Sequence, residues 1–287
     1  MVDLDLSLDL KLKICNISEP SCSWCYQCSS LALSNAQASR GVVTHSSGNH
    51  AAALARAARI RSIAAHIVMP ENSAATKIAS VRSFGFEPHF CAPSAPARAA
   101  AAEELLRQTG ATLVHPYNDV RVICGQGTVG LEILQQWPDA DVVLAPVGGG
   151  GLMSGLLVAL KAIKPSIQVI AVEPELADDA ARSLSVGAIQ QPTRYDSIAD
   201  GLRTSLGEIT FEVLREQLDE IVLVSEAEIS QAMRMLAEEV HLVVEPSGAV
   251  SLAGAIKLSS KLHGKNVCVV LSGGNLDFGT CRLGSNT

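Results

Sequence analysis

The sequence predicts an α/β fold with mainly parallel sheets flanked by helices. From residue 41 onward, short runs rich in Val and Ile alternate with Ala- and Leu-rich stretches of helical length, and three Gly-rich turns follow predicted strands. A chain of 287 residues can form one large domain or two lobes of ordinary size. We expect a small lobe of residues 41–120 and a large lobe of residues 1–40 and 121–287.

The elements follow one another along the chain in a regular order. Runs of β-branched and apolar residues predict strands at 41–46, 62–70, 86–93, 111–116, 141–147, 167–174, 220–224 and 266–274. Ala- and Leu-rich stretches predict helices from His50 onward and at 74–84, 97–110, 125–137, 152–164, 226–240 and 245–256. Gly85 and Gly110 mark two helix ends, because glycine readily adopts the conformation that terminates a helix.

The composition excludes several classes of protein. Hydrophobic residues make up 48% of the chain and charged residues 18%, which indicates a folded core and not a disordered chain. The net charge of -7 and the aromatic content of 3% argue against a nucleic-acid partner. No run of 18 apolar residues occurs, and the N-terminal residues alternate acids with leucines, unlike a signal peptide. We expect a cytoplasmic protein without a membrane partner.

The first Gly-rich turn is Ser46–His50, between a predicted strand and a predicted helix. Its hydroxyls, carboxamide and helix-start amides can hold a carboxylate and donate to a ring oxygen. An N-cap rich in Ser and Asn explains the same residues equally well.

The other two turns also follow strands. Gly148, Gly149, Gly150 and Gly151 allow backbone amides to converge on a phosphate, which we favour over a plain tight turn. This turn is neither G-x-G-x-x-G nor a Walker loop. The third turn is Leu271–Asn275, where Ser272 can meet a heteroaromatic nitrogen as a neutral partner, although an ordinary strand-to-loop turn is the alternative.

Seven segments in order resemble the fold-type II pyridoxal-phosphate enzymes, specifically the serine racemase and threonine/serine dehydratase group. They are VVTHSSGNH, GQGT, PVGGGG, AVEPELADD, SIADGLRTSLG, VVEPSGA and VVLSGGN, and they span about residues 39–279. The resemblance implies a two-lobed fold like that of the tryptophan synthase β subunit, pyridoxal 5'-phosphate as cofactor, and a homodimer.

The resemblance also implies roles for individual residues. Ser47 looks like the catalytic acid and base on the side of the α-carbon opposite the family lysine, and Ser46 and His50 look like groups that seat the substrate carboxylate. The residues that match the family's cofactor contacts are Asn49 for the 3-hydroxyl, Gly148 to Gly151 for the phosphate and Ser272 for the pyridine nitrogen. The match to a divalent-cation site, for Mg²⁺ or Ca²⁺, consists of Glu173, the Ala177 carbonyl and Asp179. Without the resemblance, Glu173 and Asp179 would be interpreted as acidic residues of a solvent-exposed loop.

The sequence departs from the family at the lysine that holds the cofactor as a Schiff base. In the family that lysine lies in a segment like S-F-K-I-R-G-A. The lysine itself would fall at about residues 19–22 here, yet no lysine occurs between Lys13 and Lys77. Read one nucleotide later, the codons of residues 23–28 permit Arg-Gly-Ala-Thr-Asn-Ala, close to the family phrase, although this shift does not restore the lysine. We hypothesise that residues 14–33 come from a shifted frame or a misplaced exon boundary.

The cysteines allow a second interpretation of the N-terminal region. Their C-x6-C-x2-C-x2-C spacing resembles a metal-ligand cluster, formed by Cys15, Cys22, Cys25 and Cys28. On the frame-shift hypothesis the cluster is an accident of translation and not a zinc site. The remaining cysteines have the surroundings of buried thiols: Cys91, Cys124, Cys268 and Cys281.

We therefore expect a racemase that converts L-serine to D-serine and also eliminates water and ammonia from L-serine, D-serine or L-threonine to give 2-oxo acids. Ser47 favours the racemase branch. The alternative is a catalytically inactive paralogue or partner subunit, supported by the missing lysine. A nucleic-acid or metal-binding module built on the cysteines conflicts with the acidic charge.

Overall fold

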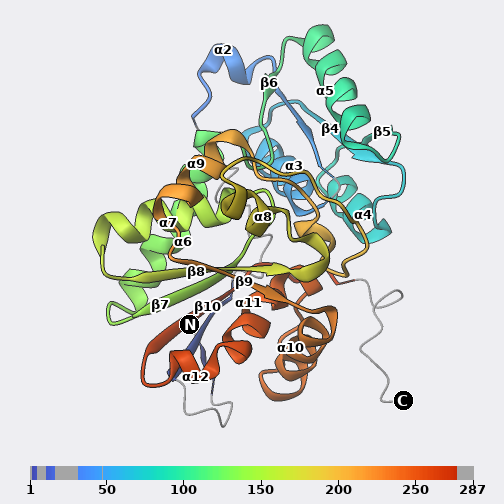
Figure 1. The fold of residues 1–287 in the computed structure, drawn as a ribbon. Coiled ribbons are helices and arrows are strands. Elements are labelled where there is room, and N and C mark those ends of the chain that lie inside the picture. Colours follow the sequence, from blue (N-terminus) through green and yellow to red (C-terminus); the bar gives the residue numbers. More distant parts are fainter. Residues whose placement is uncertain (1, 5–10, 17–31, 47, 277–287) are drawn as a thin grey trace. The chain divides into compact units, whose positions relative to one another are not determined.

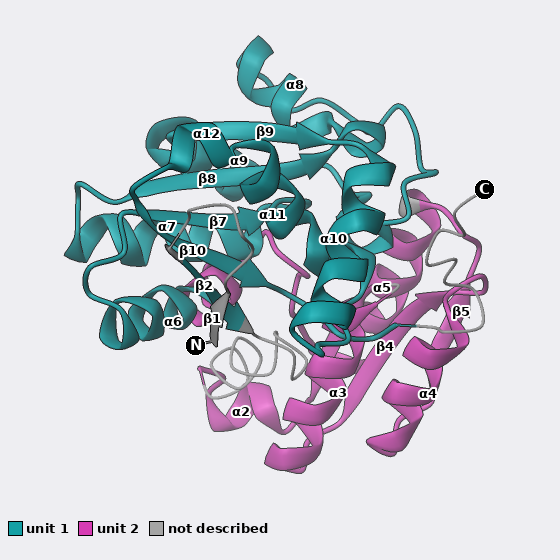
Figure 2. Ribbon diagram, turned by 90° about the horizontal axis from the view of Figure 1, so that it is seen from below, with its two compact units in different colours: residues 1–19, 126–287 teal, residues 20–125 magenta. Residues whose placement is uncertain are grey.

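A computed structural model describes residues 2–4, 11–16, 32–46 and 48–276 (Figure 1). The chain forms two compact units, residues 1–19 with 126–287, and residues 20–125 (Figure 2). The smaller unit contains the residues 41–120 that were expected to form the small lobe, together with further residues on both sides of that range. No helix in the described part of the chain is long and apolar enough to cross a membrane.

The larger unit is built on a six-stranded sheet in the order β1-β2-β10-β7-β8-β9. Its strands are β1 (Val2–Leu4), β2 (Lys11–Asn16), β7 (Val142–Pro146), β8 (Gln168–Pro174), β9 (Glu220–Val224) and β10 (Asn266–Leu271). All neighbouring strands run parallel except β1 and β2. The carboxyl ends of β10, β7 and β8 therefore lie at the same edge of the sheet.

Helices cover both faces of this sheet. They are α6 (Val120–Gln136), α7 (Gly151–Ile163), α8 (Asp179–Val186), α9 (Glu208–Gln217), α10 (Glu226–Glu239), α11 (Pro246–Lys257) and α12 (Ser259–Leu262), with the 3-10 turns η1 (Glu175–Ala177) and η2 (Asp200–Leu202). Alternate side chains of one strand join different cores: Leu144 packs with residues of α10 and α11, whereas Val143 packs with residues of α6, α7 and α9. A sheet buried on both faces explains its continuous apolar runs.

The smaller unit has a four-stranded parallel sheet in the order β5-β4-β3-β6. Its elements are α2 (Asn35–Ala38), β3 (Val42–His45), α3 (Asn49–Arg61), β4 (Ala65–Pro70), α4 (Ala75–Ser83), β5 (His89–Cys91), α5 (Ala95–Thr109) and β6 (Thr112–Leu113). Its main core is built from alanines of α3 together with aliphatic residues of β3 and β4. Small side chains let α3 approach the sheet closely.

The predicted α/β class with mainly parallel sheets is confirmed. All predicted strands and helices from residue 41 onward are present, although several begin or end a few residues away from the expected positions. The strands β1 and β2 and the helices α2, α8, α9 and α12 were not predicted from the sequence. The strand β2 carries Ile14, which is fully buried in the core of the larger unit.

Candidate active site

Gly148 to Gly151 connect β7 to α7, as the sequence predicts. Gly150 has a φ of +87°, and a Cβ there would lie 2.7 Å from Cβ of Thr210. A Cβ on Gly148 would lie 2.9 Å from Cα of Leu202. Only glycine therefore fits both positions, and the turn presents backbone amides at the start of a helix, where the helix dipole favours an anion. This observation fits a phosphate cradle.

The backbone of this turn is fixed by a neighbouring helix. Oγ1 of Thr210, in the first turn of α9, donates a hydrogen bond of 2.8 Å to the carbonyl oxygen of Gly149. Thr210 is fully buried. The hydrogen bond orients one peptide unit of the glycine turn without adding a side chain to the space in front of it.

Ser272 directly follows β10, which pairs with β7 through Val267 with Val142 and Val269 with Leu144. The S-G-G turn and the glycine turn thus follow neighbouring parallel strands at the same sheet edge. Open parallel sheets bind ligands at such edges. Two of the predicted cofactor contacts, the phosphate cradle and the partner of the pyridine nitrogen, are brought to one side of the larger unit.

Glu245 supports the S-G-G turn, a role that sequence reasoning missed. Its backbone amide donates to the carbonyl oxygen of Gly273 at 3.0 Å, and a Cβ on Gly273 would lie only 1.9 Å from Oε1 of Glu245. The Glu245 side chain is 3% exposed. Glu245 belongs to the segment VVEPSGA, which is one of the segments that carry the family resemblance. The resemblance did not predict the contact of Glu245 with Gly273.

Of the predicted cation ligands, Glu173 lies near the carboxyl end of β8, and Ala177 and Asp179 follow that strand. Glu173 is buried, and its Oε1 and Oε2 accept hydrogen bonds from the amides of Ala180 at 2.8 Å and Ala181 at 2.9 Å. Asp179 is also fully buried, and neither of its carboxylate oxygens has a hydrogen-bond partner. Glu173 and Asp179 therefore do not belong to a solvent-exposed loop. Ala177 lies between them in η1.

Burial governs the protonation of both acids. It raises the pKa of Glu173 to about 9, with further contributions from the charges of Asp179 and Asp178, and opposed by the two amide hydrogen bonds. It raises the pKa of Asp179 to about 7. A cation would neutralise both groups and give the bare Asp179 oxygens a partner, so these residues fit one. Among the described residues, no group of three or more His, Cys, Asp or Glu side chains gathers in a way that could hold a metal ion.

In the smaller unit, the S-S-G-N-H turn joins β3 to α3. The Ser46 amide donates to the Val68 carbonyl at 3.0 Å, and Oγ of Ser46 accepts from the Gly48 amide at 3.2 Å. Gly48 caps α3, whose first residue is the half-buried Asn49. Ser47, the predicted catalytic serine, lies outside the described residues. The turn leads into a helix start as foreseen, but its N-cap is Gly48 without a side-chain cap hydrogen bond, so the alternative of a Ser- or Asn-based N-cap is wrong.

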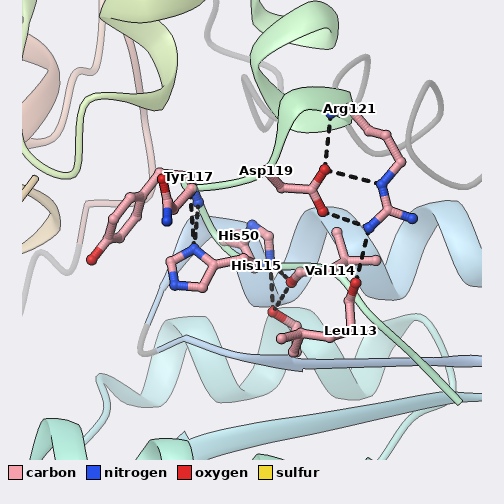
Figure 3. A network of polar contacts seen from close by, with 9 residues as sticks. His50, Leu113, Val114, His115, Tyr117, Asp119 and Arg121 are labelled. Carbon is pink, nitrogen blue, oxygen red and sulfur yellow. Dashed lines mark hydrogen bonds and ion pairs between the residues drawn. The ribbon is translucent and has the colours of Figure 1, made fainter. Parts of the chain in front are cut away.

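His50 lies in the first turn of α3 with its ring buried (Figure 3). Thr44 donates from Oγ1 to the Val114 carbonyl at 2.8 Å, so Nε2–H of His50 donates to Oγ1 of Thr44 at 2.6 Å. Burial lowers the pKa of His50 to about 3, which keeps the ring neutral. The imidazole thus links α3 to β3. Any contribution of His50 to binding the substrate carboxylate would come from its position in the first turn of α3.

A polar network beside His50 was not foreseen. Nδ1 of His115 accepts hydrogen bonds from the amides of Tyr117 at 3.3 Å and Asn118 at 2.9 Å (Figure 3). Beyond it, Asp119 and Arg121 form an ion pair, and Arg121 also donates to the Leu113 carbonyl at 3.0 Å. These contacts fix the loop after β6. They are local contacts, between residues two to eight positions apart, and the sequence analysis identified no motif in this segment.

The cysteine cluster falls mostly outside the described residues, which include Cys15 but not Cys22, Cys25 or Cys28, and the same holds for most of the segment assigned to a shifted frame. Burial raises the pKa of the Cys15 thiol to about 11, which disfavours the thiolate that binds zinc. The expectation of a buried thiol is confirmed for Cys268 and wrong for Cys124, which lies on the exposed side of α6.

Comparisons with known proteins agree with this architecture. The family described as "Pyridoxal-phosphate dependent enzyme" matches residues 24–273. A serine racemase of Arabidopsis thaliana is 46% identical over 255 residues, which are 87% of this chain and 77% of that protein. The structure of maize serine racemase superposes with a TM-score of 0.93 at 42% identity, covering 98% of this chain and 88% of the maize chain.

A threonine deaminase is similar as well. The crystal structure of a threonine deaminase from T.th. has a TM-score of 0.89 at 40% identity and covers 97% of this chain and 92% of its own. These relatives do not support the alternative of a catalytically inactive paralogue. The chain belongs to the fold-type II pyridoxal-phosphate-dependent enzymes, in the group that contains serine racemases and threonine deaminases.

Proposed function

We propose that this chain is a serine racemase that also eliminates water and ammonia from L-serine, D-serine or L-threonine to give 2-oxo acids. One observation carries the proposal: 46% identity to a serine racemase over 87% of this chain, in a fold whose glycine turn and Ser272 lie at one sheet edge. Similarity to a threonine deaminase supports the elimination reaction.

Pyridoxal 5'-phosphate, when bound, supplies an electron sink that lets the α-proton of an amino acid leave. The amides of Gly148 to Gly151 would hold its phosphate. Ser272 would meet the pyridine nitrogen through a neutral hydroxyl, whereas a carboxylate in its place would hold that nitrogen protonated. Asn49 would donate to the 3-hydroxyl oxygen.

The S-S-G-N-H turn would act on the substrate. Ser46 and the first turn of α3 at His50 would hold the α-carboxylate, because helix-start amides favour an anion. Ser47 would exchange a proton at the α-carbon, and delivery to the face opposite to removal gives the D-isomer. If the β-hydroxyl leaves the same substrate as water instead, the resulting aminoacrylate is hydrolysed by water to pyruvate and ammonia.

A divalent cation, Mg²⁺ or Ca²⁺, would bind at Glu173, the Ala177 carbonyl and Asp179. The unpartnered, fully buried oxygens of Asp179 support this assignment. An oxygen-only ligand set suits these hard cations. The resemblance to the racemase group also supports a homodimer.

The direct test is a product assay on the purified full chain with pyridoxal 5'-phosphate, Mg²⁺ and L-serine. Chiral chromatography should detect D-serine, and coupling to lactate dehydrogenase should detect pyruvate. L-threonine should give 2-oxobutanoate. Cofactor without protein and an Asn49→Ala variant are the controls. Product formation no faster than with the cofactor alone would reject the proposal.

A further inference from the structure

We propose that His66 and His89 form a surface site for a divalent transition-metal ion, and that Zn²⁺ is the ion whose geometry it fits. The two residues lie on β4 and β5, neighbouring parallel strands at one edge of the sheet of the smaller unit (Figure 1). The site is separate from the cation site proposed at Glu173 and Asp179, which belongs to the larger unit. The inference does not depend on the proposed racemase chemistry.

The strand register brings the two imidazoles together on one face of the sheet. Val68 of β4 is paired with His89 of β5. His66 precedes Val68 by two residues, and side chains two positions apart on a strand point to the same face. His66 and His89 are therefore diagonal neighbours, and their ring centres lie 5.6 Å apart with the ring planes tilted by 41°. Because the strands are held by backbone pairing, the two ligands are close to each other before an ion arrives.

The separation of the rings matches a shared zinc ion. With a zinc–nitrogen bond of about 2.0–2.1 Å and about 1.1 Å from nitrogen to ring centre, zinc lies about 3.2 Å from each ring centre. A tetrahedral angle at the metal then places the two ring centres about 5.2 Å apart. The observed 5.6 Å exceeds this value by less than half an ångström, which small side-chain rotations within a rotamer can absorb.

The surroundings of the pair leave room for an ion and its water ligands. His89 is exposed and His66 is half-buried. Imidazole nitrogen is a favoured ligand of zinc and of other borderline divalent ions. Since no third His, Cys, Asp or Glu side chain joins this pair among the described residues, water would complete the coordination shell. Such a site would be open and its ion would exchange readily with solvent.

A bound ion would hold β5 against β4. The strand β5 has three residues, and among the described strands it pairs with β4 alone. An ion that binds the paired strands and not the unfolded chain stabilises the folded state by mass action. The site would therefore make the stability of this sheet edge depend on the concentration of the ion.

Protection of the two histidines by Zn²⁺ tests the site directly. The full chain, as purified without an affinity tag and with Mg²⁺ present to fill the proposed oxygen site, is treated with diethyl pyrocarbonate, which modifies accessible imidazoles. Peptide mass spectrometry then compares samples with and without Zn²⁺. We expect Zn²⁺ to protect His66 and His89 and to leave His263, an exposed histidine after α12, as reactive as before.

Equilibrium dialysis with Zn²⁺ measures the contribution of each imidazole. His66→Asn and His89→Asn should each weaken binding at this site at least about tenfold, because a single imidazole loses the advantage of two linked ligands. His263→Asn is the matched control and should bind as the unmodified chain does. Any zinc held by the cysteines would bind equally to all of these proteins and would not alter the comparison.

Two results would overturn the inference. Zn²⁺ that leaves His66 and His89 open to the reagent would exclude the site, whether or not the ion binds elsewhere on the chain. Equal Zn²⁺ binding by the unmodified chain and by both asparagine variants would exclude it as well. The protection experiment uses the unmodified chain, so its result does not depend on whether any variant folds.

Discussion

Nε2 of His50 lies 2.6 Å from Oγ1 of Thr44, and both side chains are buried in the smaller unit. The bond joins the first turn of α3 to β3, the two elements that flank the S-S-G-N-H turn. The geometry of that turn thus depends on the hydrogen bond between His50 and Thr44.

Replacing Thr44 should weaken this support. Thr44→Val removes the hydroxyl and with it the 2.6 Å hydrogen bond of His50, leaving the longer contact of 3.3 Å between Nε2 and the Val114 carbonyl oxygen. The free energy of unfolding should fall by about 1–3 kcal/mol. Thr44→Ser keeps the hydroxyl and should cost much less. Urea denaturation measures both, and equal stability of the Val variant and the unmodified chain would contradict this role.

Acid should destabilise the smaller unit through its histidines. Burial lowers the pKa of His45 from 6.5 to about 4, helped by His115 and Arg98, and that of His50 to about 3. The pKa of His115 is also lowered by burial, although Asp119 opposes the shift. Below pH 6.5 the unfolded chain binds protons that the folded chain does not, so stability present above that pH is lost as the pH falls toward 4.

Urea denaturation at about pH 7.5 and about pH 5 tests this dependence. His45→Gln should reduce the loss between the two pH values. His263→Gln, at an exposed position after α12, is the matched control and should leave the loss unchanged. A loss between the two pH values that is as large in His45→Gln as in the unmodified chain would contradict the buried neutral state of His45.

Removal of divalent cations should make stability depend on pH in the opposite sense. Burial raises the folded pKa of Asp179 from 3.8 to about 7 and of Glu173 from 4.5 to about 9. Because the folded chain then holds protons more tightly than the unfolded one, stability in EDTA should fall as the pH rises from about 5 to about 8. Mg²⁺ or Ca²⁺ should restore it by replacing the protons.

Thermal melting with and without the cation measures this effect. Asp179→Asn should remove most of the response to the cation and flatten the pH dependence, because the amide stays neutral. Asp196→Asn, an exposed acid paired with Arg194, should leave both unchanged. A cation response that persists in Asp179→Asn would place the cation elsewhere.

The glycine turn should tolerate no side chain. Gly150→Ala introduces a Cβ 2.7 Å from Cβ of Thr210 at a φ of +87°, so it should weaken cofactor binding at least about tenfold as the turn shifts. Gly187→Ala is the matched control, since it has a φ of +76° but no atom within 4 Å of its Cβ. Equilibrium dialysis with pyridoxal 5'-phosphate should separate the two, and equal affinities would argue against a phosphate at this turn.

Much of the fold could be predicted because its strands are continuous β-branched runs and its turns are rich in glycine. The strands β1 and β2 could not, because β2 joins the sheet through β10, at the other end of the chain. The helices α8 and α9 are only 8 and 10 residues long, so few turns display their period. For the site, the glycine-rich segments marked Gly148–Gly151 and Ser272 as candidates, but the contact of Glu245 with Gly273 could not be predicted from residue spacing.

Removal and return of the α-proton of serine is the reaction on which the proposed function depends, and proton exchange in heavy water measures it most directly. The purified chain with pyridoxal 5'-phosphate and Mg²⁺ is mixed with L-serine in D₂O and followed by proton NMR. We expect loss of the α-proton signal with accumulation of deuterated D-serine, faster than with cofactor alone. An α-proton signal that persists at the rate of the protein-free control would contradict the proposed function.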